Sequence, residues 1–403
     1  MRLSVCLLGL CFCLPFVSGQ DLTEREALQK LTSESPRARA LAAQVELARA
    51  SALTEGLYPN GALTVSREAA AGTPETYLLY EQPLSVTGRR GYLRRAALAA
   101  AESEGSFVRM QLHELRVDAR LAFLELLLAQ EQLSVYDSEK ASLQQIVEVL
   151  QKREKAGESS GYDLIRAERE LSLLEADQGN AQAQVEKARG LLASFFATSQ
   201  DAQGLRAVGA LTVPAVPDLA SLIGRSGARG DIQAERQLAE SSALSMEAAH
   251  RKMYPEPIVT GGLKSPVVSG QRESGYVISV TVPLPLFDRG KAEMGRAEIA
   301  RRAAESRADA IKAEVQLRLK GAWEETQTRI RVAGIYQKKA VAETGNLIRI
   351  ARAAYEGGEV GILELLDAYR TQREVRLRMP EFAATARQSA LELERLVGEE
   401  VIP

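Results

Sequence analysis

Two short segments of this 403-residue chain bring glycine, carboxylate and arginine residues together at matching spacings. The first runs from Gly157 to Arg169 and the second from Gly358 to Arg370, with Gly, Glu, Leu, Ala and Arg in register and no gap. In each segment an acidic residue stands close to a basic or aromatic one. Such groups could attract or repel ions, but carboxylates also stabilise the first turn of a helix by themselves. The residues alone leave both interpretations open.

Catalytic chemistry finds no support in the sequence. It contains no phosphate-binding loop, no nucleophile with a matched histidine and no paired metal ligands. The histidines, His113 and His250, fall in separate helical segments. The formal net charge is −2 with both signs well mixed, so nothing indicates a nucleic-acid partner. We therefore predict that the protein is not an enzyme and has no cofactor and no resident metal.

Long helices are expected on both sides of each glycine turn. The segment from Arg89 to Lys155 is helical in character almost without a break, and at 1.5 Å per residue it would reach about 100 Å. Arg289 to Tyr355 is its counterpart in the second half. After the turns, residues repeat the +3, +4 spacing of a coiled-coil seam. The seam positions are Leu164, Ala167, Leu171, Leu174 and Gln178, then Leu365, Ala368, Gln372, Val375 and Met379.

The pattern changes to alternation in two places, at about residues 61–83 and 257–284, and each indicates a β-hairpin. The last strand places four apolar residues on one face and the polar Ser279 and Thr281 on the other. The apolar residues are Tyr276, Ile278, Val280 and Val282. Strands of this length and pattern suit a β-barrel in an outer membrane. An ordinary soluble hairpin remains the alternative for the first pair.

The chain is predicted to be a signal peptide followed by two similar halves. Residues 1–19 have a short basic start, an apolar stretch and a cleavage site before Gln20, and they contain all the cysteines, Cys6, Cys11 and Cys13. The first repeat is expected over residues 20–200, a linker over 201–228 and the second repeat over 229–403. Each half reads as helix, β-hairpin, long helix, turn and helix, with the turns at about 156–162 and 356–363. The first helix is expected to start at Gln20 and to restart at Ser35-Pro36.

This duplicated order resembles the outer-membrane efflux protein family typified by TolC, and most of all its heavy-metal branch, similar to the CzcC and CusC type. The segments that carry the resemblance are Ser35-Pro36 to Ala50, Tyr58-Pro59, Tyr254-Pro255, Pro283 to Gly290, the turns at Gly157 and Gly358, and Leu363 to Arg370. The second half departs from the family at Arg229-Gly230-Asp231, where a proline is usual, so we expect a looser helix start there. Lipid attachment at Cys11 has weak support, because Leu10 precedes it.

The resemblance implies a mainly α-helical protein with a membrane β-barrel, assembled as a homotrimer with a shared barrel and a trimeric α-helical tunnel. It would lie in the cell outer membrane with a periplasmic extension. Its implied partners are a periplasmic adaptor and an inner-membrane pump of the metal-type resistance-nodulation-division class. The implied function is passive export of metal ions or small toxic compounds. A periplasmic adaptor or a structural coiled-coil protein is the alternative.

The resemblance also assigns roles to the two turns. A ring of like charge repeated around a closed trimer would favour cations. The predicted gate residues are Tyr162, Asp163, Arg166, Glu364, Asp367 and Arg370. The predicted adaptor-docking residues are Gly157, Glu158, Gly358, Glu359, Val360, Gly361 and Ile362. The simpler interpretation is that the glycines let the chain reverse and the carboxylates cap helices.

Overall fold

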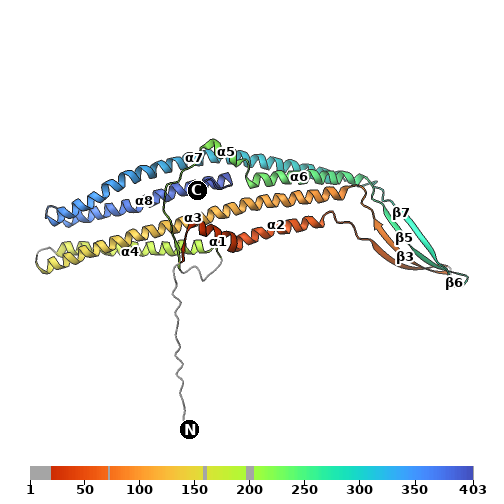
Figure 1. Cartoon of the computed structure of the whole chain (residues 1–403), viewed down its shortest axis with the longest axis horizontal. Coiled ribbons are helices and arrows are strands. Elements are labelled where there is room, and N and C mark those ends of the chain that lie inside the picture. The colour runs from red at the N-terminus through yellow and green to blue at the C-terminus, as the bar shows by residue number, and fades with distance from the viewer. Residues whose placement is uncertain (1–19, 71–72, 158–160, 197–203, 403) are drawn as a thin grey trace, which may run out of the picture.

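The computed structural model describes residues 20–70, 73–157, 161–196 and 204–402. The molecule is elongated, with the β-strands at one end and the turns of the long helical hairpins at the other (Figure 1). Helices α1 and α5 and the C-terminus lie near the middle. The predicted signal peptide, residues 1–19, lies outside the described residues.

The first half of the described chain follows the predicted order of elements. They are β1 (Gln20–Leu22), α1 (Glu24–Glu34), α2 (Pro36–Thr54), β2 (Ala62–Ala70), β3 (Thr73–Pro83), α3 (Arg89–Lys155) and α4 (Gly161–Ala193). The predicted restart at Ser35-Pro36 is confirmed, because the Ser35 hydroxyl accepts a hydrogen bond from the Ala38 N–H and Pro36 is the first helical residue. The prediction of a helix from Gln20 is wrong: Gln20–Leu22 is a strand, and α1 begins after the cap Thr23.

The second half repeats this order. Its elements are β4 (Leu205–Ala207), α5 (Leu219–Ser226), α6 (Gly230–His250), the 3-10 turn η2 (Arg251–Met253), β5 (Ile258–Val268), β6 (Gln271–Arg272), β7 (Gly275–Thr281), α7 (Lys291–Glu356) and α8 (Ile362–Val397). Strand β4 lies in the segment expected to be a linker and pairs in parallel with β1. This long-range pairing explains why the chain is extended at Gln20.

The start of α6 is held firmly, so the expectation of a loose start at Arg229 is wrong. The Arg229 guanidinium bonds to both carboxylate oxygens of Asp231, at 3.0 and 2.7 Å. It also donates to the carbonyl of Arg395 at 3.0 Å, near the end of α8. These bonds join the start of α6 to the end of α8 and give backbone carbonyls there a partner.

The strands form one antiparallel sheet in the order β2, β3, β5 and β7, with the short β6 paired to the end of β5. Strands β3 and β5 join the two halves of the chain over nine residue pairs, from Glu75 opposite Pro266 to Pro83 opposite Ile258. The outer strands β2 and β7 leave open edges in the single chain. Large apolar side chains on the sheet are exposed, including Leu63, Val65 and Ile278.

Apolar contacts hold the helices together in separate clusters along the length of the molecule. A central cluster joins α1, α3 and α4 to the β1–β4 pair. A second cluster lies close to the helical turns and contains Leu143, Val147, Leu150, Ala167, Leu174, Ile362, Leu365, Leu366 and Tyr369. The two predicted seams therefore meet in one apolar cluster shared by both helical hairpins. This contact fixes the relative position of the two turns.

Candidate functional site

Each long helix is followed by a glycine in the left-handed region of backbone space. After α3 the chain turns at Gly157, whose φ is 74°, and after α7 it turns at Gly358, whose φ is 73°. This left-handed backbone favours glycine and is common just past a helix end. In the second turn the Glu359 N–H donates to the Ala354 carbonyl at 2.8 Å, which satisfies one of the last carbonyls of α7. Both glycines are thus explained by the reversal of the chain.

The predicted docking residues divide into an exposed group and a buried residue. Gly157, Gly358, Glu359 and Gly361 are exposed and Val360 is half-buried. Ile362 is only 3% exposed and belongs to the apolar cluster beside the turns. Glu158 lies outside the described residues. The exposed surface of the second turn is therefore Gly358 to Gly361. The next residue, Ile362, packs into the apolar cluster and holds the turn in place.

The predicted gate residues of the first turn lie at the start of α4. The Arg166 Nε donates to the Tyr162 hydroxyl at 2.8 Å, and the guanidinium carbon lies 5.0 Å from the centre of the Tyr162 ring. This cation–π contact occupies Arg166. Within the described part of the chain, Asp163 makes no ion pair and no side-chain hydrogen bond.

The predicted gate residues of the second turn lie on the first turns of α8. Glu364 and Asp367 are exposed on α8. Arg370 turns away from the turn and binds Glu170 of α4 with two nitrogens, one at 3.0 Å. Among the described residues, Asp163 and Asp367 make no ion pair, while Arg166 binds Tyr162 and Arg370 binds Glu170. A groove of about 400 Å³ runs between α4 and α8 and includes Tyr162, Arg166, Glu170 and Arg370 in its lining.

Sequence reasoning missed a buried charge cluster one to two helical turns from the gate residues. Glu139 of α3 is 6% exposed and Glu170 of α4 is 5% exposed. Arg373 of α8 lies between them, 3.4 Å from a carboxylate oxygen of each. A signal was present in the sequence: Glu139 follows the seam spacing of Tyr136, Leu143, Ile146 and Leu150, a position where an apolar residue is expected.

The two buried carboxylates differ in their electrostatic state. The hydrogen bond from Arg370 lowers the pKa of Glu170, against the opposing effect of burial. Burial raises the pKa of Glu139 to about 7, and the charges of Arg373 and Arg376 offset it only in part. Since Glu170 has two arginine partners and Glu139 shares one of them, the difference follows from the geometry.

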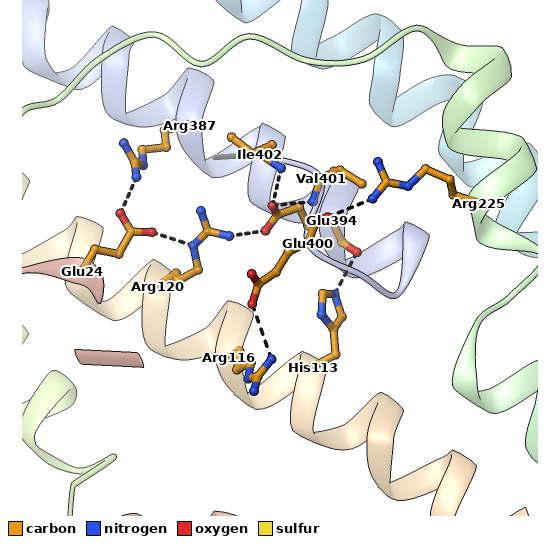
Figure 2. Close-up of polar contacts among 10 residues, drawn as sticks. All are labelled: Glu24, His113, Arg116, Arg120, Arg225, Arg387, Glu394, Glu400, Val401 and Ile402. Atoms are coloured by element: carbon orange, nitrogen blue, oxygen red, sulfur yellow. Dashed lines mark hydrogen bonds and ion pairs between the residues drawn. The ribbon is translucent and has the colours of Figure 1, made fainter. Parts of the chain in front are cut away.

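A second polar cluster lies near the middle of the molecule and ties both ends of the described chain to the long helices (Figure 2). Glu394 of α8 is fully buried; its carboxylate binds Arg120 and accepts hydrogen bonds from the N–H groups of Val401 and Ile402, at 3.0 and 2.7 Å. Arg120 also binds Glu24 of α1 at 2.6 Å. The cluster therefore fastens the N-terminal helix and the C-terminal residues to α3.

His113 belongs to the same cluster and has a structural role. Its Nε2 lies 2.9 Å from the backbone carbonyl of Glu394. Because a carbonyl only accepts hydrogen bonds, the Nε2 atom carries the hydrogen. Burial lowers the pKa of His113, which favours the neutral ring. In the described ranges, no group of three or more His, Cys, Asp or Glu side chains is placed to hold a metal ion.

The arrangement defines a class of protein: a duplicated chain with a β-sheet at one end and paired long helical hairpins at the other. None of the helices in the described residues is long and apolar enough to cross a membrane. Each half contributes one β-hairpin and one helical hairpin, so the two turns lie at the same end of the molecule (Figure 1).

This fold matches solved outer-membrane channels along almost the whole chain. One match is CusC, whose structures concern folding and transmembrane channel formation. It aligns with a TM-score of 0.73 at 17% identity, covering 95% of this chain and 93% of that one. The CmeC outer-membrane channel of Campylobacter jejuni aligns with a TM-score of 0.73 at 14% identity, covering 99% and 94%. A membrane protein from Pseudomonas aeruginosa aligns with a TM-score of 0.75 at 21% identity, covering 93% and 92%.

A similar curated protein is the cobalt-zinc-cadmium resistance protein CzcC of Cupriavidus metallidurans. It is 24% identical over 392 residues, covering 93% of this chain and 91% of that protein. No protein-family model matches the chain. The resemblance to outer-membrane efflux proteins, which the sequence indicated, is confirmed by these matches, and the chain has the fold of these channels.

Proposed function

We propose that this protein is the outer-membrane channel of a tripartite efflux system and passively exports metal ions from the periplasm. The observation that carries the proposal is the placement of two β-hairpins and two helical-hairpin turns at opposite ends of one duplicated chain. A sheet with exposed apolar residues suits a membrane, and a long helical stalk suits a duct toward a pump. The name of the cobalt-zinc-cadmium resistance protein CzcC supports a metal cargo, and the structure of CusC supports a transmembrane channel.

The proposed active form is a homotrimer with a shared β-barrel and a common helical tunnel. The open edges of β2 and β7 cannot stay unpaired in lipid, because each free backbone group there costs several kcal/mol, so further copies are expected to close the sheet. The number three comes from the family resemblance. Helix α7 supports association along the stalk, since Ile299, Leu317 and Ile335 are exposed and recur at a spacing of whole helical turns.

The proposed partners are a periplasmic adaptor at the turns and an inner-membrane pump of the metal-type resistance-nodulation-division class. The exposed segment from Gly358 to Gly361 is the proposed docking surface. The proposed organisation of the chain is a signal peptide at residues 1–19, repeats at 20–200 and 229–403, and a connecting segment between them. An adaptor function is disfavoured, because the fold matches channels over more than nine-tenths of the chain.

The proposal can be tested in a strain that lacks its own metal-efflux channel but keeps the matching pump and adaptor. We expect the full-length gene to restore resistance to cobalt, zinc or cadmium, and the membrane-extracted protein to migrate as a compact form that heating converts to a slower one. A gene encoding an adaptor from the same system serves as the negative control. A protein that is released without detergent and shows no heat-modifiable form would contradict the channel assignment.

A further inference from the structure

Glu139 occupies an unusual place in the contact between the two helical hairpins. It lies on the apolar seam of α3, next to the cluster that contains Leu143 and Leu174, and is almost completely buried. A buried charge is expensive unless it is fully paired. The contact around Glu139 is made by α3, α4 and α8, and α8 is the helix that carries Glu364 and Asp367 toward the turn.

The charges around Glu139 leave it only half compensated. Arg373 of α8 divides its guanidinium between Glu139 and Glu170 at 3.4 Å each. Arg370 is bound to Glu170, and Arg376 donates to the Ser138 hydroxyl at 2.9 Å.

The remaining charged groups nearby are also occupied. Lys140 of α3 binds Glu175 of α4 at 3.1 Å. From α7, the helix on the other side of α8, Arg352 binds the Tyr369 hydroxyl, one turn before Arg373. Glu139 therefore has no arginine or lysine of its own among the described residues.

We propose that Glu139 is a proton-controlled clamp between the hairpins: its neutral form holds α8 against α3 and α4, and its ionised form loosens that contact. Protonation removes the partly compensated buried charge of Glu139 and its repulsion with Glu170, and it leaves Arg373 free to bind Glu170 alone. The free-energy cost of the ionised Glu139 carboxylate falls only if water reaches it. Water can reach it only if α8 moves away from α3.

The direction of the pH effect follows from the raised pKa of Glu139, which burial moves from 4.5 to about 7. The packed arrangement binds a proton more tightly than an opened, solvated one. Its stabilisation is therefore fully present below the solvated pKa and is lost as the pH rises through about 7. After allowing for solvent screening, we expect the ratio of packed to open forms to fall at least about tenfold between pH 5.5 and 8.5.

The meaning of the clamp for export rests on the proposed function. If α8 lines the closed end of the tunnel, an acidic periplasm would tighten that end and an alkaline one would loosen it. The adaptor would then open the duct against a resistance that depends on the pH outside the inner membrane.

Hydrogen exchange followed by mass spectrometry on the full-length, detergent-extracted protein tests the clamp without relying on export. The readout is the protection of residues 362–379 in the parent and in Glu139→Gln, compared at each pH so that intrinsic exchange rates cancel. We expect nearly equal protection at about pH 4, where Glu139 is mostly protonated in the packed and the opened arrangement alike. At pH 8.5 we expect at least about tenfold faster exchange in the parent, because only the parent ionises.

Two variants serve as controls. Glu148→Gln changes an exposed carboxylate of the same helix and should leave the profile of the parent unchanged. Glu170→Gln removes the partner of Arg370 and Arg373, and should speed exchange of α8 at all pH values. If the parent and Glu139→Gln show the same dependence on pH, the clamp is overturned.

Conductance in planar bilayers separates this inference from the proposed function. A pH step in exchange without any channel conductance would uphold the clamp and overturn the channel. Channel conductance without the exchange step would uphold the channel and overturn the clamp.

Discussion

At the scale of single residues, the molecule contains buried carboxylates with opposite degrees of compensation. Glu394 has Arg120 and two backbone N–H groups around its carboxylate, although burial still raises its pKa. Glu139 has a share of Arg373. The first arrangement suits a permanent structural tie, because the carboxylate keeps its partners at all times. The second suits a group whose charge changes near neutral pH.

The permanence of the Glu394 tie leads to a stability prediction. Glu394→Ala should destabilise the helical part by about 3–5 kcal/mol, because it leaves Arg120 buried without one of its partners and frees the C-terminal residues. Glu392→Ala is the matched control: this neighbouring carboxylate is half exposed and pairs with Arg395, so its loss should cost about 0–1 kcal/mol. Urea unfolding followed by far-ultraviolet circular dichroism measures both. Equal effects would contradict the structural role.

The turn glycines Gly358 and Gly361 differ in how much their backbone conformation requires glycine. Gly358 has a φ of 73°, so Gly358→Ala should destabilise the turn by about 1–2 kcal/mol. Gly361 has a φ of −85°, and an added Cβ would meet a movable carboxylate oxygen of Glu364 at 3.2 Å. Gly361→Ala should therefore change the stability by less than about 0.5 kcal/mol. Local hydrogen exchange of residues 354–366 distinguishes the two, and a larger effect at Gly361 would contradict the backbone argument.

At the scale of elements, the sequence predicted what depends on local pattern and missed what depends on distant partners. The long helices, the glycine turns and the strands follow from spacing and from residues such as Pro36 and Gly157. Strand β1 could not be predicted, because its three residues are extended only through pairing with β4. Likewise, the pairing of Arg370 with Glu170 depends on how the two hairpins pack, which the local sequence does not reveal.

The faces of strand β7 lead to a prediction for the barrel. Ile278 is 73% exposed in the single chain, on the same face as Tyr276 and Val280. Ile278→Arg should cost about 2–4 kcal/mol if this face meets lipid near the middle of the membrane. Ser279→Arg, on the face opposite, should be tolerated, since a water-filled lumen accepts charge. The measurement is the fraction of heat-modifiable protein in outer membranes, and similar fractions for both variants would argue against the lipid-facing assignment.

At the scale of the whole molecule, the carboxylates of Asp163 and Asp367 can form a charged ring only when several copies of the chain assemble. Asp163 and Asp367 are left without ion pairs in the described single chain, whereas Arg166 and Arg370 are occupied by Tyr162 and Glu170. Repetition around a closed trimer would gather like charges at the narrow end. Further along the stalk, Arg370 and Arg373 of α8 both bind Glu170 of α4.

The double variant Asp163→Asn with Asp367→Asn tests whether these carboxylates select ions. If they form a ring at the narrowest point, neutralising them should lower the preference for cations over anions in planar bilayers, because such rings attract the opposite charge. Folding should change little, since each carboxylate is at least partly exposed and has no ion pair with the described residues. Glu359→Gln is the control, because its side chain is exposed on the turn before α8 begins. If the double variant keeps the selectivity of the parent while its helices melt at a slightly lower temperature, the carboxylates act as helix-start charges and the ion-selective constriction lies elsewhere.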